Sequence, residues 1–154
     1  MPSSSGISPA MVAIIADSPD AELLLQHTRD VLTRFDVPYL LRTITDTTIN
    51  QVISELDSAS VFIAVNALAA QIAPLTVKPV LAVPLETPNL PPLDALKTTT
   101  SGGPVASLAI GKAGATNAAL LAIAILANSN PALREKLTQF RTQQTQSVLA
   151  DRLD

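Results

Sequence analysis

Short apolar segments alternate with longer amphipathic segments along most of this chain, and this alternation strongly constrains the fold. The runs at residues 11–16 and 61–65 are apolar throughout, which is typical of strands buried on both faces. Residues 21–36 instead repeat their apolar side chains at helical spacing, along one stripe. Strands that alternate with helices predict a parallel sheet with helices on both faces.

The expected fold is therefore α/β, with three layers (αβα) and a five-stranded, parallel, flavodoxin-like sheet. We expect residues 1–10, rich in Ser and Pro, to form a flexible N-terminal arm, and residues 11–154 to form a single domain. The pattern predicts strands at 11–16, 38–44, 61–65, 79–85 and 104–110, and helices at 21–36, 45–56, 67–72, about 93–97, 113–127 and 131–149.

Composition excludes several classes of function. The net charge is −3 and only 3% of the residues are aromatic, so nucleic acid is not an expected partner. The chain has no cysteine, and His27 is its single histidine. Thiol nucleophiles, thiolate metal sites and multi-histidine metal sites are thereby excluded. We expect no metal and no cofactor.

The longest apolar run, residues 118–127, is too short to span a bilayer, which takes about 20 residues. No membrane association is therefore expected. The first ten residues lack the basic and apolar regions of a secretory signal. We therefore expect a cytoplasmic protein.

The run at 118–127 also predicts self-association. It is apolar around its whole circumference, and a domain of this size can cover such a helix only if the helix is central. A second subunit is the preferred explanation, with a central helix in a monomer as the alternative. The expected interface residues are Lys112, Asn117, Leu120, Leu121 and Ile125.

Ligands of open parallel sheets bind beyond the carboxyl ends of the strands, where the strand order reverses. This rule directs attention to residues 17–20, 45–48 and 66–71 and to the loops after Leu85 and Ile110. Asp17 and Asp20 are either a carboxylate pair or, as we prefer, a helix N-cap and its neighbour. The ligand-binding candidates are Asp17, Ser18, Asp20, Thr45, Thr47, Thr48, Asn66 and Gln71.

Several segments resemble the class I PurE family of purine synthesis, which comprises N5-carboxyaminoimidazole ribonucleotide mutases and related aminoimidazole ribonucleotide carboxylases. The resemblance is carried by Gly111-Lys-Ala-Gly-Ala-Thr-Asn-Ala-Ala-Leu-Leu-Ala122, by Phe35-Asp-Val-Pro-Tyr39 and by Lys78-Pro-Val-Leu-Ala-Val-Pro84. It covers nearly the whole chain from Met11. It implies the same α/β fold and a homo-octamer assembled through the C-terminal helices.

The motifs that resemble the family's active site are altered. The serine and aspartate turn after the first strand reads Ala16-Asp-Ser-Pro-Asp20, so that only the last aspartate is kept. The position of the family's phosphate-binding Arg is Thr48, and the position of its catalytic His is Gln71. Glutamine does not titrate near neutral pH and cannot act as a general acid or base.

Two kinds of function follow from this comparison. The first is a protein that keeps the fold but has lost mutase activity, acting as an oligomeric scaffold or small-ligand binder, alone or together with an active relative. The second is a divergent mutase or carboxylase, of purine biosynthesis or of another heteroaromatic substrate. No catalytic residue is assigned, and whether the chain is an enzyme stays open at this point.

Overall fold

The computed structural model describes residues 12–45, 48–99 and 102–151. Its described strands form one sheet in the order β2-β1-β3-β4-β5, and every pairing is parallel. This is the flavodoxin-like order, in which the chain starts in the middle of the sheet. The order in which strands are added reverses between β1 and β3, and this place is the switch point of the sheet. The strands are β1 (Val12–Ala16), β2 (Tyr39–Thr43), β3 (Val61–Val65), β4 (Val80–Val83) and β5 (Ala106–Ser107).

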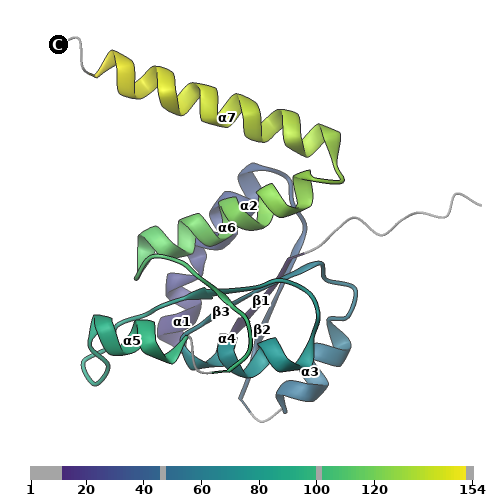
Figure 1. Ribbon diagram of the computed structural model, residues 1–154, viewed down its shortest axis with the longest axis vertical. Helices are drawn as coiled ribbons and strands as arrows, with labels where there is room; N and C mark the ends of the chain where they lie inside the picture. Colours follow the sequence, from purple (N-terminus) through teal and green to yellow (C-terminus); the bar gives the residue numbers. More distant parts are fainter. Residues whose placement is uncertain (1–11, 46–47, 100–101, 152–154) are drawn as a thin grey trace, which may run out of the picture.

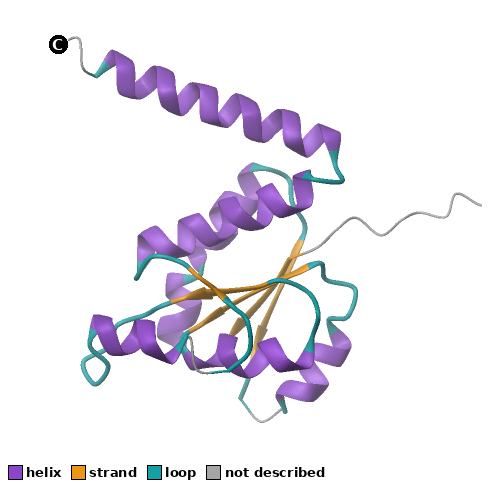
Figure 2. Ribbon diagram, viewed as in Figure 1, coloured by secondary structure: helices purple, strands orange, loops and turns teal. Residues whose placement is uncertain are grey.

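Helices cover both faces of this sheet, so the expected three-layer α/β fold is confirmed (Figures 1 and 2). The helices are α1 (Pro19–Leu24), α2 (Gln26–Arg34), α3 (Ile49–Glu55), α4 (Ala67–Ile72), α5 (Pro92–Thr98), α6 (Lys112–Ala127) and α7 (Pro131–Ala150), with a 3₁₀ turn η1 (Ala73–Leu75) after α4.

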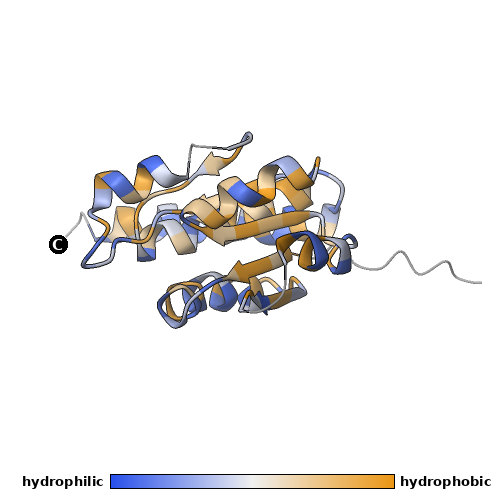
Figure 3. Ribbon diagram, turned by 90° about the horizontal axis from the view of Figure 1, so that it is seen from below, coloured by the Kyte–Doolittle hydropathy of each residue, from blue (hydrophilic) through white to orange (hydrophobic). Residues whose placement is uncertain are grey.

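The three central strands are buried along their whole length, as their apolar composition predicts. Successive side chains of β1 enter two different cores. Val12 and Ile14 pack under α2 and α6, whereas Ala13 and Ile15 pack against α3 and α4. In Figure 3 the strands lie between the helices and are coloured mostly at the hydrophobic end of the scale. The sheet thus separates two apolar layers that fix its register.

The helix expected at 21–36 is divided in two, which corrects that prediction. Pro19 begins α1, because proline suits the first helical position, where its missing N–H costs nothing. The helix then bends at Leu25, whose ψ is −2°. The bend lets α1 follow β1 while α2 packs along α6.

The strands expected at 38–44 and 79–85 are slightly shorter, Tyr39–Thr43 and Val80–Val83, and two other elements are much shorter than predicted. The helix expected at 45–56 begins at Ile49, after Thr48 in an extended conformation. The strand expected at 104–110 is only Ala106–Ser107. Pro104 cannot donate a hydrogen bond to the sheet, because it has no N–H. After Ser107, the Leu108 N–H donates to the Ala82 carbonyl at 2.9 Å, and the next bond to the β4 side is from the Gly111 N–H to the Pro84 carbonyl. The arm expected at 1–10 lies outside the described residues.

The helix α6 is covered by α2 on one side and by α7 on another. Tight packing at its start depends on Gly114, where a Cβ would lie 1.6 Å from the Ala109 carbonyl oxygen. Leu121 on its remaining face is 37% exposed. The helix is therefore neither fully central nor fully covered within one chain. Among the described residues, no helix is long and apolar enough to cross a membrane.

Candidate functional site

The carboxyl ends of β1, β2 and β3 meet at one edge of the sheet, and most of the predicted ligand-binding residues follow them directly. Ile44, just after β2, donates its N–H to the Ala16 carbonyl at the end of β1, at 2.8 Å. Asp17 and Thr45 are thereby neighbours of this junction, and both are exposed. Thr47 is outside the described residues. We call this edge, with the turns that leave it, the carboxyl edge.

The turn after β1 is organised as the start of a helix. Ser18 is the N-cap of α1, and its Oγ accepts the Ala21 N–H at 3.2 Å. This corrects the expectation that Asp17 or Asp20 caps the helix, since the shorter hydroxyl side chain occupies the extended N-cap position. Asp20 instead lies in the first turn of α1, where its negative charge interacts favourably with the helix dipole. The Ser18 hydroxyl oxygen is therefore already engaged in a hydrogen bond with the main chain.

The same turn carries a negative charge that the predictions did not include. Glu22 follows Asp20 in α1, and its carboxylate accepts a hydrogen bond from the Thr43 hydroxyl, at the last residue of β2. Asp17, Asp20 and Glu22 therefore concentrate three carboxylates near the end of β1. Nothing in the spacing of Glu22 and Thr43 marks the pair, because only the parallel alignment of β1 and β2 brings them together.

The turn after β3 contains two of the predicted residues in different situations. Asn66 is half-buried, and its side-chain amide bonds the backbone of Leu85. Gln71 is exposed on α4, one turn further along the chain. Thr48 is exposed at the start of α3, and its side chain makes no capping bond. The structure therefore places Asn66 in the framework of the edge and leaves Gln71 and Thr48 at its surface.

The backbone next to Gln71 is covered by the loop that follows α5. A Cβ at Gly102 would lie 2.2 Å from the Ala70 carbonyl oxygen, and a Cβ at Gly103 would lie 3.0 Å from the Ala73 side chain. At Gly102 only glycine allows the loop to lie this close to α4, whereas at Gly103 a side chain would require a small shift of Ala73. The space over this part of α4 is filled by main chain.

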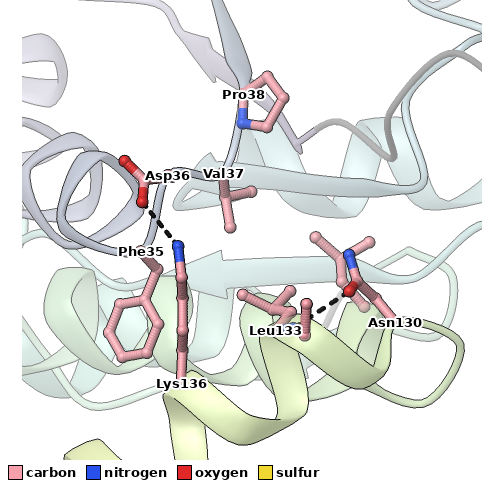
Figure 4. Close-up of a pocket in the computed structure, with 9 residues that line it drawn as sticks. Phe35, Asp36, Val37, Pro38, Asn130, Leu133 and Lys136 are labelled. Atoms are coloured by element: carbon pink, nitrogen blue, oxygen red, sulfur yellow. Dashed lines mark hydrogen bonds and ion pairs between the residues drawn. The ribbon is translucent and has the colours of Figure 1, made fainter.

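An open pocket lies at the opposite edge of the sheet. Its volume is about 190 Å³, and it is lined by the turn from α2 to β2 and by the junction of α6 and α7. At its mouth the Lys136 ammonium reaches the Asp36 carboxylate at 2.6 Å (Figure 4). Pockets for small molecules usually enclose about 300–1,000 Å³, so this cavity is small for a ligand. No group of three or more His, Cys, Asp or Glu side chains within residues 12–45, 48–99 and 102–151 is placed to hold a metal ion.

The sheet order and the carboxyl edge define a class of protein, the flavodoxin-like α/β domains that place their sites at the switch point of the sheet. Comparison with known proteins narrows this class. The family model described as AIR carboxylase matches residues 11–147. The chain belongs to this family, to which the sequence motifs already showed a resemblance.

Curated relatives agree with this assignment. The N5-carboxyaminoimidazole ribonucleotide mutase of Pseudomonas aeruginosa is 35% identical over 153 residues, covering 91% of this chain and 94% of the relative. The mutase of Escherichia coli K12 is 36% identical, with 95% and 94% covered. That of Methanocaldococcus jannaschii is 33% identical, with 91% and 94% covered.

Proposed function

We propose that this chain is a member of the AIR carboxylase family without mutase activity, which serves as an oligomeric scaffold or a binder of a small ligand. The observation that carries the proposal is Gln71. It stands where the resemblance places the catalytic histidine, on the helix that follows β3. A carboxamide neither gives nor takes a proton near neutral pH, so the proton transfer of a carboxylate migration has no general acid or base at this position.

The surroundings of Gln71 support the same proposal. Asp17 places a carboxylate beside the turn where the resemblance implies a bound phosphate, and like charges repel. Pro19 removes a main-chain donor from this turn, and Ser18 uses its hydroxyl within α1. Thr48 stands in place of the implied phosphate-binding Arg. Each change weakens the binding of a phosphorylated substrate in a different way.

A divergent mutase is the second candidate, and it is supported by the similarity to known mutases. The relatives named above share about a third of their residues with this chain over nearly its full length, and all of them are mutases. For this candidate to hold, Gln71 would have to orient the substrate while another group moves the proton.

One assay separates the two candidates. Purified chain, expressed in a host lacking its own mutase, is incubated with N5-carboxyaminoimidazole ribonucleotide, and formation of 4-carboxyaminoimidazole ribonucleotide is followed. The Pseudomonas aeruginosa relative is the positive control. We expect a rate at least about 10²-fold below the control, because a positioned general acid or base contributes roughly 10²–10⁴-fold.

A rate within tenfold of the control would overturn the proposal and establish the divergent mutase. In that case Gln71→Ala is the informative variant. Loss of the rate in Gln71→Ala assigns the glutamine to substrate orientation, whereas an unchanged rate places the chemistry on other residues of the edge.

We also propose that the scaffold is a homo-oligomer, in agreement with the octamer that the resemblance implies. Leu121 on α6 and Ile110 just before it are each 37% exposed. Every residue from 141 to 150 in α7 is exposed, and this half of the helix extends away from the body in Figure 1. A short helical extension without packing is marginal by itself, which favours a second copy of the chain as its support. Whether an active relative can join the assembly is a separate question for co-purification.

A further inference from the structure

Asn66, at the end of β3, has a backbone conformation that side chains rarely adopt. Its φ is +50° and its ψ is −137°, a region that is strained for a residue other than glycine. Asn66 is also the N-cap of α4, yet its side chain makes no capping bond. Such a conformation persists only where the surrounding structure holds it in place.

What holds Asn66 is the backbone of Leu85, nineteen residues further along the chain. The Leu85 N–H donates to Asn66 Oδ1 at 2.8 Å, and Asn66 Nδ2 donates to the Leu85 carbonyl oxygen at 3.1 Å. One side-chain amide therefore satisfies both main-chain polar groups of a single residue. Both residues are half-buried, so these bonds are partly shielded from water.

The two bonds occupy the place of the next step of the β3–β4 ladder. Val65 pairs with Val83, and the Asn66 N–H donates to the Val83 carbonyl at 3.2 Å. In a parallel ladder, the residue two further along β4, Leu85, would next donate to the Asn66 main-chain carbonyl. That carbonyl has turned away and accepts the Ala69 N–H inside α4 instead, at 3.2 Å.

We infer that Asn66 is a positioning residue whose side-chain amide substitutes for this missing ladder step. The amide supplies Leu85 with an acceptor oxygen and with one of its two N–H donors, where a continued ladder would have supplied main-chain groups. The main chain can thus leave the sheet for α4 while the hydrogen bonding of the sheet continues into the loop after β4.

The consequence is a fixed loop at the carboxyl edge. On its other side the Gly111 N–H donates to the Pro84 carbonyl at 2.8 Å. Further along, Thr87 and Leu90 exchange two main-chain hydrogen bonds of 3.0 Å each. The segment from Pro84 to Leu90 is therefore held at its start from both sides and closed on itself. It is a preset wall of the edge and not a lid that closes over a ligand.

Hydrogen exchange of the Leu85 amide in the full chain, measured by NMR, tests this inference. Asn66→Gly removes the amide and relieves the positive φ, so that loss of the bonds is separated from added strain. We expect the protection of Leu85 to fall at least tenfold, while the amide of Ile14 in the core of β1 keeps its protection. Asn89→Ala, an exposed asparagine in the same loop, is the matched control and should leave Leu85 unchanged. Unchanged protection in Asn66→Gly would overturn the inference.

Asn66→Asp supplies a readout that general destabilisation does not give. A carboxylate accepts from the Leu85 N–H but cannot donate to the Leu85 carbonyl, whereas a neutral carboxyl does both. The bond to the Leu85 N–H is therefore kept in Asn66→Asp at neutral pH, whereas the bond to the Leu85 carbonyl is lost. Protection of the Leu85 amide, corrected for the intrinsic exchange rate, should be clearly higher in Asn66→Asp than in Asn66→Gly at neutral pH.

Equal loss of Leu85 protection in Asn66→Asp and Asn66→Gly, with Ile14 still protected in both, would also overturn the inference. The exchange experiment needs no substrate and no activity, and its outcome is therefore independent of the proposed loss of mutase chemistry.

Discussion

Among the described residues, Thr28 is one of two polar side chains that the core encloses fully. Its hydroxyl donates to the Ala115 carbonyl oxygen at 2.7 Å and joins α2 to the first turn of α6. A buried hydroxyl without a partner is costly, and this bond removes the cost while fixing how the two helices meet. Sequence spacing does not reveal this bond, because the two residues lie 87 positions apart.

Replacing Thr28 by valine tests this contact, because valine has nearly the same shape. We expect Thr28→Val to lower the free energy of unfolding by about 1 kcal/mol. The loss stays at this level because the Ala115 carbonyl keeps a donor within its own helix. Thr33→Val, at an exposed position of the same helix, should change the value by less than about 0.5 kcal/mol. Urea unfolding followed by circular dichroism measures both, and equal effects would contradict the assignment.

Elements were predictable where local pattern decides them. β3 and α4 match their expected ranges, because an unbroken apolar run ends where a short helix begins. The lengths of β5 and α3 were overestimated, since apolar content alone does not show that Pro104 and the extended Thr48 limit an element. At the candidate site, the parallel sheet predicted which turns meet. It could not predict that the side chains of Ser18 and Asn66 form hydrogen bonds with the main chain, because those bonds depend on conformations that exist only in the folded protein.

The helix α7 divides into a packed half and an unpacked half. Leu133 and Leu137 are buried against α6 and its surroundings. The Phe140 ring meets the Phe35 ring edge to face, with centroids 5.4 Å apart, and the Arg34 guanidinium lies 5.1 Å from the Phe140 centroid. These contacts end at Phe140, since all residues from 141 to 150 are exposed. The apolar contacts, more than the exposed ion pair of Lys136, hold α7 to the body.

This division predicts an uneven response to truncation along one helix. Leu137→Ala should lower the free energy of unfolding by about 2–3 kcal/mol, through lost burial and the cavity left behind. Lys136→Ala removes an exposed ion pair with Asp36 and should cost less than about 1 kcal/mol. Thermal or urea unfolding of the two variants at equal protein concentration gives the comparison. If Lys136→Ala proved the more damaging, the ion pair and not the apolar contacts would hold α7 to the body.

At the scale of the whole molecule, two apolar surfaces are relevant to self-association. The sheet encloses two cores, yet Val148 and Leu149 near the end of α7 remain 56% and 57% exposed, in addition to the open face of α6. Exposed apolar side chains on a helix that projects from a small domain favour a contact with another molecule. We propose a second copy as the partner, because the extended half of α7 and the face of α6 belong to the same polypeptide, so that each copy offers both a projecting helix and a surface to receive one.

The mass in solution decides this point. At micromolar concentration, light scattering after gel filtration should give a multiple of 16.1 kDa. Leu121→Asp places a charge on the open face of α6 and should shift the chain towards the monomer, because a buried unpaired carboxylate opposes association. Leu23→Asp, at an exposed leucine of α1 on another part of the surface, should leave the mass unchanged. A wild-type mass of one chain would refute the homo-oligomer, and an oligomer that tolerates Leu121→Asp but not Leu23→Asp would move its interface from α6 to α1.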